Sequence, residues 1–359
     1  MAERVLVAMS GGVDSSACVS LLQSQGYEVG GVVFDMSPAH IQAVKDARLA
    51  ADFFGVPLTV CNLRERFSRE VIDYFCQSYL SGETPNPCVR CNPTVKFAAL
   101  YEEMRRGGYD WMATGHYAGI VRRGDTCYFT QAQSAQRDQS YMLYRLPQEI
   151  MARLLLPLAG MEKPQVRRLA QEAGLPTFDK PDSQENCFIP DGDYPAYVEG
   201  RCGPSRRGQF IAPDGSPAGP HRGIAHYTVG QRKGLGIALG RPVFVRAIDP
   251  ASGDVLLCDA GEEYAQEIAL REVCAPDPTQ LAEGARVLVK IRSVAKPCPA
   301  TLHPLPGGDL TVRFEAPQRA PAPGQSAVFY QDGLVIGGGI IDRPRPENGG
   351  AADGSQATA

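Results

Sequence analysis

The sequence predicts an α/β protein in which a doubly wound, parallel-sheet nucleotide-binding domain is followed by a small connecting domain and an antiparallel β-barrel. In the first half, continuous apolar segments alternate with amphipathic helical segments. After about Asp193 glycine and proline become dense, and short strand patterns then continue to residue 341. We therefore expect domains at 1–193, 194–263 and 264–343, and a disordered polar tail at 344–359.

The elements of the first domain follow in a regular order. We expect strands at residues 4–9, 29–35, 58–61 and 110–113, and helices at 15–25, 41–54, 65–79 and 95–106. Gly26 and Gly55 come directly after the first two helices, where a left-handed residue commonly ends a helix. In a doubly wound sheet the ligand lies beyond the carboxyl ends of the strands.

The second half is typical of antiparallel sheet. Strand patterns occupy residues 243–248, 254–258, 286–291, 309–314, 326–330 and 334–341. Turn sequences at 306–308 and 331–333 separate neighbouring strands, as in hairpins. We expect the last four of these strands to belong to the barrel.

Composition excludes several classes of protein. The 359 residues, 43% hydrophobic and 21% charged, are those of an ordinary globular chain of two or three domains. No apolar stretch approaches the roughly 20 residues of a membrane helix, and the N-terminus lacks a signal peptide, so we expect a cytoplasmic protein.

The net charge of -4 argues against nonspecific polyanion binding by the whole surface. Residues 201–233 carry six basic residues and one acid, which suits either a local RNA contact or an ordinary solvated loop.

The most specific motif is SGGVDSS at residues 10–16, placed between the first strand and the first helix. Glycines let the backbone approach an anion, and the N–H groups at a helix start bind it. Ser10, Ser15 and Ser16 add hydroxyl donors, and Asp14 is a candidate Mg²⁺ ligand. No Gly-Lys-Ser/Thr occurs, so the loop is not a Walker A motif. It resembles the PP-loop, SGGxDS, of the ATP pyrophosphatase superfamily, whose members split ATP between the α and β phosphates; a plain connecting turn is the alternative.

We expect three of the eleven cysteines in polar loops rich in proline, asparagine and aspartate, where chemistry is plausible: Cys88, Cys91 and Cys187. Cys91 precedes the helix expected at 95–106, and Arg90 and Lys96 are close in sequence. A helix start and nearby cations lower a thiol pKa, so we expect Cys91 to be reactive. The spacing Cys88-x-x-Cys91 also suits half a zinc site, but no second half follows. From its loop alone, Cys187 is as readily an inert thiol.

Seven segments together resemble the bacterial tRNA-specific 2-thiouridylase family (MnmA, also called TrmU) between about residues 4 and 342. They are SGGVDSS (10–16), TPNPCVRCN (84–92) followed by Lys96-Phe97, ATGHY (113–117), RDQSY (137–141), residues 182–189 around Cys187, YTVGQRKGLG (227–236) and PGQSAVFY (323–330).

The resemblance implies a reaction. ATP would adenylate the C2 oxygen of the wobble uridine (position 34) in the glutamate, glutamine and lysine tRNAs. Sulfur would arrive as a persulfide from a cysteine desulfurase or a sulfur-relay protein. By motif, Cys187 carries the persulfide, Cys91 is the nucleophile that releases the product, and a transient Cys91–Cys187 disulfide remains. A monomer is expected.

The resemblance also implies the binding residues, with Asp14 counted as catalytic. For ATP, with Mg²⁺, they are Ala8, Met9, Ser10, Gly11, Gly12, Val13, Asp14, Ser15, Met36 and Gly115. For tRNA they are Asn86, Pro87, Cys88, His116, Arg137, Asp138, Gln139, Arg292, Ser293 and Gln325. The sequence departs from the family pattern at Cys88, often Asp, and at Ser293, where an aromatic residue is common.

Three alternatives remain open. The trio Cys88, Cys91 and Cys187 is also the pattern of PP-loop tRNA thiolases that hold a [4Fe–4S] cluster. A PP-loop ligase or amidotransferase, such as argininosuccinate or GMP synthetase, would have no use for paired loop cysteines. A tRNA-binding module without catalysis predicts damage to the phosphate loop or to one cysteine, and the sequence shows neither.

Overall fold

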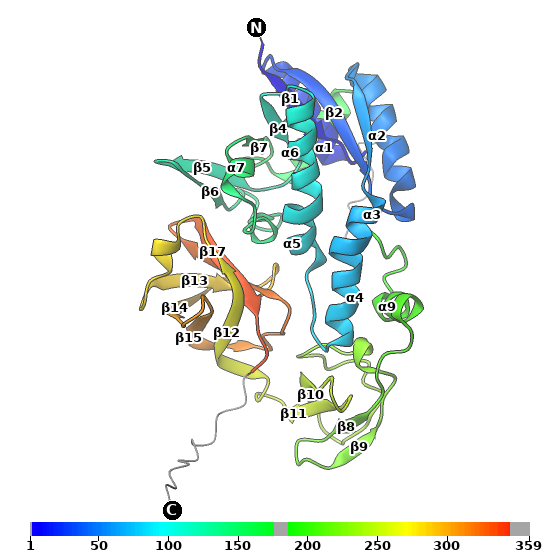
Figure 1. The fold of residues 1–359 in the computed structure, drawn as a ribbon, viewed down its shortest axis with the longest axis vertical. Coiled ribbons are helices and arrows are strands. Elements are labelled where there is room, and N and C mark those ends of the chain that lie inside the picture. The colour runs from blue at the N-terminus through cyan, green and yellow to red at the C-terminus, as the bar shows by residue number, and fades with distance from the viewer. Residues whose placement is uncertain (1, 176–185, 345–359) are drawn as a thin grey trace, which may run out of the picture.

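The structure, a computed structural model, describes residues 2–175 and 186–344 (Figure 1). Residues 182–185 of the expected thiol segment and 345–359 of the expected tail lie outside this part of the chain. Figure 1 shows the parallel sheet at one end of the molecule, the connecting domain at the other, and the barrel beside them. Within the described residues, no helix is both long and apolar enough to traverse a lipid bilayer.

The first domain is the doubly wound parallel sheet that the sequence predicts. Its strand order is β3 (Leu58–Asn62), β2 (Glu28–Asp35), β1 (Arg4–Ala8), β4 (Trp111–Ala113) and β7 (Leu154–Leu155), and all neighbours pair in parallel. The order reverses at β1, so the switch point lies between β1 and β4, where a nucleotide binds in such sheets.

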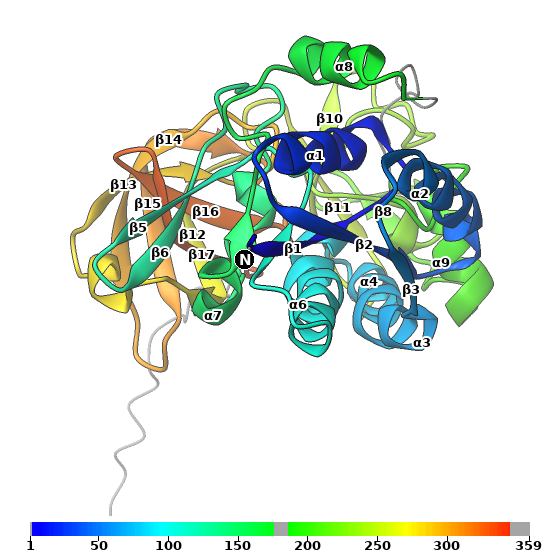
Figure 2. The same ribbon diagram turned by 90° about the horizontal axis from the view of Figure 1, so that it is seen from above.

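Helices cover both faces of this sheet (Figure 2). The helices α1 (Val13–Ser24), α2 (Ile41–Phe54) and α8 (Lys163–Glu172) pack on the face to which Val5 and Val7 point. The helices α4 (Asp73–Leu80) and α6 (Phe97–Arg106) pack on the opposite face, with Leu6. Because successive strand residues point to opposite faces, a strand buried on both sides must be apolar throughout.

The helical segments around the cysteines differ from the expectation. The helix expected at 65–79 is α3 (Arg64–Phe67), a π-helical turn η2 (Ser68–Ile72) and α4. The helix expected to begin at 95 begins earlier, as α5 (Pro87–Cys91), and continues through the π-helical turn η3 (Asn92–Lys96) into α6. The prediction that Cys88 and Cys91 lie in a loop is therefore wrong. Its basis was the content of proline and asparagine, but both residues also favour a helix start.

The connecting domain begins with α9 (Tyr194–Cys202), which packs against α4. Its sheet has the order β10 (Val243–Ile248), β11 (Val255–Asp259), β8 (Gln209–Ile211) and β9 (Pro217–Pro220). The two strands expected here, 243–248 and 254–258, are present, and β8 and β9 were not predicted.

The barrel is a closed antiparallel sheet of six strands, as the fold prediction requires. They are β12 (Tyr264–Cys274), β13 (Arg286–Lys290), β14 (Cys298–Pro304), β15 (Leu310–Arg319), β16 (Ser326–Gln331) and β17 (Leu334–Ile341). The strand β12 pairs with both β15 and β17, which closes the ring. A hairpin of the first domain, β5 (Gly119–Arg123) and β6 (Thr126–Thr130), extends the sheet by pairing β6 with β17.

Candidate nucleotide and thiol site

The phosphate loop lies between β1 and α1 and packs tightly against α2. Gly11 has φ of 71°, and a Cβ there would stand 2.4 Å from the Cβ of Asp46. A side chain is therefore excluded both by the backbone conformation and by space. Gly12 is the N-cap of α1, so the first N–H groups of that helix face the loop. This arrangement suits an anion at the start of α1.

The three serines of the motif have different environments. Ser15 Oγ accepts a hydrogen bond from Ser10 N at 3.1 Å and donates to Gly12 O at 3.1 Å, so it braces the loop from inside. Ser16 is fully buried, and its Oγ has no hydrogen-bond partner among the described residues. Ser10 alone is exposed, so it is the hydroxyl that can meet a phosphate.

Asp14, the expected Mg²⁺ ligand, already has polar partners. Its Oδ1 and Oδ2 are 2.8 and 2.7 Å from Lys163 Nζ, and Tyr117 OH donates to Oδ1 at 2.8 Å. The backbone of Gly115 passes so close that a Cβ there would be 3.0 Å from Asp14 Cβ. Sequence reasoning missed Lys163, because nothing local marks it and it lies 149 residues from Asp14.

The remaining ATP candidates lie around the carboxyl ends of β1 and β2. Ala8 ends β1, and Met9 is buried in the core shared with α1 and α2. Val13 is buried in a separate small cluster with Ala170 and Leu175. Met36 follows β2 and is 7% exposed, in the core on the other face. Met9 and Met36 are thus buried apolar residues on opposite faces of the sheet.

The expected thiols come together around Lys96. Burial raises the pKa of Cys91 to about 12, the Lys96 charge opposes this rise, and negative charge on Cys88 or Cys187 adds to it. Cys187 is exposed to solvent, yet desolvation by surrounding atoms raises its pKa to about 11, again opposed by Lys96. Such mutual influence requires proximity. Lys96 in η3 is therefore close enough to act electrostatically on Cys91 of α5 and on Cys187 of the segment after residue 185.

Phe188 fixes the position of Cys187. Its ring is buried and packs edge-on against Phe67 at 5.6 Å and Phe75 at 5.2 Å, centroid to centroid. Edge-to-face contacts at these distances are favourable beyond the burial of area. The thiol therefore stands at the junction of α3 and α4, next to α5 in space.

Two neutral histidines border the same cation. Burial, followed by repulsion from Lys96, lowers the pKa of His116 to about 3. The His116 ring contacts Thr114 Oγ1 at 2.9 Å and lies 5.4 Å from the Phe97 ring. His40 has its pKa lowered by the same two causes in the same order. Burial thus favours the neutral form of both imidazoles.

Several residues expected to touch tRNA serve the fold itself. Asn86 is the N-cap of α5, and its Oδ1 accepts from Cys88 N at 3.1 Å and Val89 N at 3.4 Å. The Asp138 carboxylate is 1% exposed and accepts from Ser140 Oγ at 3.0 Å. Gln139 Oε1 accepts from Tyr117 N at 2.9 Å.

Two more of these residues join domains. Arg292 Nη2 donates to Ala320 O at 2.9 Å and Val229 O at 3.3 Å, which links the barrel to the connecting domain. Gln325 Nε2 donates to Thr84 O at 2.8 Å and links the barrel to the segment before α5. The other expected contacts, apart from His116 and the buried Pro87, are at least partly exposed; they are Cys88, Arg137 and Ser293.

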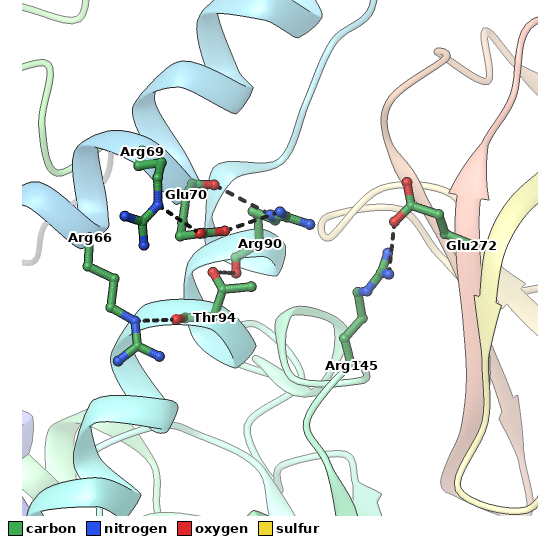
Figure 3. A network of polar contacts seen from close by, with 7 residues as sticks. All are labelled: Arg66, Arg69, Glu70, Arg90, Thr94, Arg145 and Glu272. Carbon is green, nitrogen blue, oxygen red and sulfur yellow. Dashed lines mark hydrogen bonds and ion pairs between the residues drawn. The ribbon is translucent and has the colours of Figure 1, made fainter.

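An arginine-rich surface beside the thiols was not predicted (Figure 3). Arg66 Nε donates to Thr94 O at 2.8 Å, and Arg90 forms an ion pair with Glu70 at 3.3 Å. Across the gap to the barrel, Arg145 pairs with Glu272 at 3.0 Å (Figure 3). A hollow of about 950 Å³ adjoins this network, lined by Asn62, Arg64, Glu65, Arg66, Arg69, Glu70 and Thr94. The spacing of arginines at 64, 66 and 69 could have signalled it.

No group of three or more His, Cys, Asp or Glu side chains is arranged to hold a metal ion within residues 2–175 and 186–344. The cysteine trio is thus not positioned as a set of ligands in this conformation.

Comparisons with known proteins cover the whole described fold. Family profiles match for the tRNA methyl transferase HUP domain (residues 3–191), the tRNA methyl transferase PRC-barrel domain (196–259) and the aminomethyltransferase beta-barrel domain (267–341). The chain is 42% identical to the tRNA-specific 2-thiouridylase MnmA of Acetivibrio thermocellus, over 94% of this chain and 99% of that protein. It is 43% identical to the protein of the same name from Carboxydothermus hydrogenoformans, over 95% and 98%.

Among solved structures, a 4-thiouridine synthetase–RNA complex with bound ATP is similar at 19% identity, with a TM-score of 0.34, over 50% of this chain and 43% of that chain. At that TM-score the match supports no conclusion about function.

Proposed function

Because this chain belongs to the tRNA-specific 2-thiouridylase family, whose members are sulfurtransferases that modify tRNA, we propose that it adenylates the C2 oxygen of a wobble uridine and replaces it by sulfur. The substrates we propose are the glutamate, glutamine and lysine tRNAs. The sulfur comes from the persulfide of a cysteine desulfurase or a relay protein, and the enzyme acts as a monomer.

The observation that carries the proposal is that one cation, Lys96, acts on both Cys91 and Cys187, in the domain that also holds a loop suited to an anion. A buried structural thiol needs no cation beside it, and an inert surface thiol needs no second thiol. A cation that stabilises two neighbouring thiolates serves sulfur chemistry instead.

The first step is adenylation. The C2 oxygen of the uracil attacks the α-phosphorus of ATP, and the bond from that phosphorus to the bridging oxygen breaks. Pyrophosphate leaves with the electron pair, and N3 of the base gives up its proton. Mg²⁺ would neutralise phosphate charge in this step, and Asp14 is the side chain that would hold it. The product is a base with a good leaving group at C2.

Sulfur transfer follows in two displacements. The terminal sulfur of the Cys187 persulfide attacks C2, and AMP leaves with the former base oxygen. The Cys91 thiolate then attacks Sγ of Cys187, the S–S bond breaks, and the sulfur stays on the base, which regains its N3 proton. One Cys91–Cys187 disulfide remains, and a thiol reductant returns both thiols.

Cys91 must be activated before it can attack Sγ of Cys187. With a pKa near 12 it is a thiol at neutral pH, and its side chain is only 6% exposed. Lys96 is the residue that favours its thiolate. The π-helical turn η3, which starts directly after Cys91, is an irregularity typical of functional helices. We propose that α5 loosens when tRNA binds and that Cys91 becomes accessible beside Lys96.

The face for tRNA is proposed from charge. The basic residues of the connecting domain are exposed at Arg206, Arg207, Arg222, Arg232 and Lys233. Together with Arg137 and the arginine-rich surface of Figure 3, they provide the phosphate contacts that dominate binding to RNA. No observation favours the iron–sulfur alternative over the persulfide route.

The experiment measures pyrophosphate release and tRNA thiolation with ATP, unmodified tRNA and a persulfide donor. The wild type is expected to do both, Asp14→Ala to do neither, and Cys187→Ser to release pyrophosphate without thiolated product. Normal thiolation by Cys187→Ser would contradict the role of that residue. Iron found in stoichiometric amount after anaerobic purification, with activity that depends on it, would support the cluster mechanism instead.

A further inference from the structure

We propose that Lys163 is a phosphate-binding residue of the adenylation step, which takes hold of the pyrophosphate portion of ATP and rests on Asp14 when no nucleotide is bound. The inference rests on the proposed use of ATP. It concerns a residue outside the SGGVDSS motif, on a helix far along the chain.

The position of Lys163 is unusual for a lysine. Only 7% of the residue is exposed, although lysine is almost never buried unless it is paired. Its Nζ stands 2.7 and 2.8 Å from the two carboxylate oxygens of Asp14. Asp14 itself lies in the first turn of α1, directly after the phosphate loop. The ammonium group is therefore within one side-chain length of the anion site.

Helix electrostatics do not account for a lysine at this position. Lys163 is the first residue of α8, where the positive end of the helix dipole disfavours a cation. The start of α8 is already stabilised by a capping box between Glu162 and Gln165, so the lysine is not needed as a cap. The cation is held there by Asp14, and it is available to a negatively charged ligand that takes the place of that carboxylate.

The two helix starts converge on one place. Val166 and Ala170 of α8 are buried, Val166 in the core shared with α1 and Ala170 against Val13 at the start of α1. The anchoring brings the N-termini of α1 and α8 toward the same carboxylate, together with Lys163. Both helix ends and the ammonium group attract an anion. Asp14 neutralises the ammonium group in this structure.

This arrangement supplies what the motif lacks. A Walker A loop carries its own lysine, which reaches the β and γ phosphates, and SGGVDSS has none. When the bond between the α-phosphorus and the bridging oxygen breaks, negative charge grows on the departing pyrophosphate. A cation held in a site of low exposure stabilises that charge strongly. Lys163 can do so once Asp14 turns to other partners.

The test compares ligands that differ in phosphate content, using the full-length protein. Lys163→Met is expected to weaken binding of ATP and of inorganic pyrophosphate by about 10- to 100-fold, the usual loss for a charge-assisted hydrogen bond, and to leave AMP binding within about twofold. Lys163→Arg should recover part of the pyrophosphate affinity. Lys45→Met, at an exposed position of α2, is the matched control and should bind all three ligands normally.

A double variant separates a phosphate contact from a purely structural role. In an Asp14→Asn background no carboxylate is left for the lysine to neutralise, so Lys163→Met should still cost pyrophosphate binding if the lysine touches phosphate. Equal pyrophosphate affinity of Asp14→Asn and Asp14→Asn/Lys163→Met would overturn the proposal, as would equal weakening of AMP and ATP. If the wild type binds ATP and pyrophosphate but never thiolates tRNA, the proposed function fails while the role of Lys163 stands.

Discussion

At the scale of single residues, Lys96 is central to the candidate site, because its charge acts on both the thiols and the histidines. Burial raises the pKa of Cys91 and Cys187 and lowers that of His40 and His116; the Lys96 charge opposes the first effect and adds to the second. The Lys96 charge therefore makes the two thiols easier to ionise than burial alone would allow. The same charge favours the neutral form of the two imidazoles.

Removing the Lys96 charge should slow the reaction of the Cys187 thiol with an alkylating reagent. Lys96→Met is expected to raise the pKa of the exposed Cys187, and each unit of rise lowers the thiolate fraction by about tenfold below the pKa. Alkylation of Cys187 by iodoacetamide at pH 8.5, followed by peptide mass spectrometry, should therefore slow several-fold. Lys45→Met is the control with a distant charge removed. An unchanged rate in Lys96→Met would show that the ammonium does not act on this thiol.

His116 should make stability depend on pH. Its pKa falls from 6.5 to about 3 on folding, so the unfolded chain gains a proton below pH 6.5 that the folded protein does not. The part of the free energy of unfolding that is linked to His116 is fully present above pH 6.5 and is lost as the pH falls toward 3. Between pH 7.5 and 5 the free energy of unfolding should drop by on the order of 2 kcal/mol from this group.

Urea unfolding at these two pH values measures the effect. His116→Gln removes the titrating ring, so the variant should show a smaller fall in stability than the wild type between pH 7.5 and 5. Equal falls in the two proteins would mean that His116 is not the group responsible.

At the scale of elements, the short helix α5 controls access to Cys91. Asn86 caps its first turn, and Pro87 occupies the first helical position, so a five-residue helix with little intrinsic stability is held at its start. The π-helical turn that follows leaves its backbone less regular. An element built in this way can open without disturbing the sheet behind it.

Weakening the cap should expose the thiol. Asn86→Ala removes the acceptor for Cys88 N and Val89 N and is expected to cost about 1 kcal/mol of local stability. Alkylation of Cys91 should then rise about fivefold, while Asn86→Asp, which can still cap, should behave like the wild type. If Asn86 contacts only the target base, Asn86→Ala would raise the KM for tRNA and leave Cys91 alkylation unchanged.

The elements predictable from sequence are those whose signal is local. The strand at 4–9 and the helices at 15–25 and 41–54 were found, because a continuous apolar run or a helical period followed by glycine marks each one. The pairing of β6 with β17 was not, because the two strands are about 200 residues apart and only the fold sets their register. The same limit hid Lys163, since its partner Asp14 lies in a different element. For α5 the prediction failed because proline and asparagine are common both in loops and at helix starts. The sequence was interpreted as a loop, whereas a helix begins there.

At the scale of the whole molecule, buried polar contacts join the barrel to the sheet domain. Thr84 N donates to Pro323 O at 2.8 Å, Gln325 Nε2 donates to Thr84 O, and Arg271 Nη2 binds Glu83 at 2.9 Å. These contacts fix the segment just before α5. The barrel therefore sets the position of the cysteine helix from outside, although it contributes no thiol.

Breaking the ion pair between Arg271 and Glu83 should weaken the attachment of the barrel to the sheet domain. The side chains of Arg271 and Glu83 are 27% and 14% exposed, so Arg271→Met leaves a nearly buried carboxylate with a weaker partner. We expect the free energy of unfolding to fall by about 1–3 kcal/mol. Arg286→Met is the matched control, because its pair with Glu315 is mostly exposed, at 84% and 58%, and should change stability by less than about 0.5 kcal/mol. Urea unfolding of both variants checks this, and equal losses would contradict it.

The central claim is that one fold brings two distant cysteines together to pass sulfur to an adenylated base. Its most direct test is the amount of Cys91–Cys187 disulfide after a single turnover, measured by non-reducing peptide mass spectrometry on enzyme loaded with one persulfide. The account predicts one linked Cys91–Cys187 peptide for each uridine thiolated, and in Cys91→Ser a reductant-sensitive adduct of tRNA with Cys187. Full thiolation with both thiols still free, or normal turnover by Cys91→Ser, would contradict it.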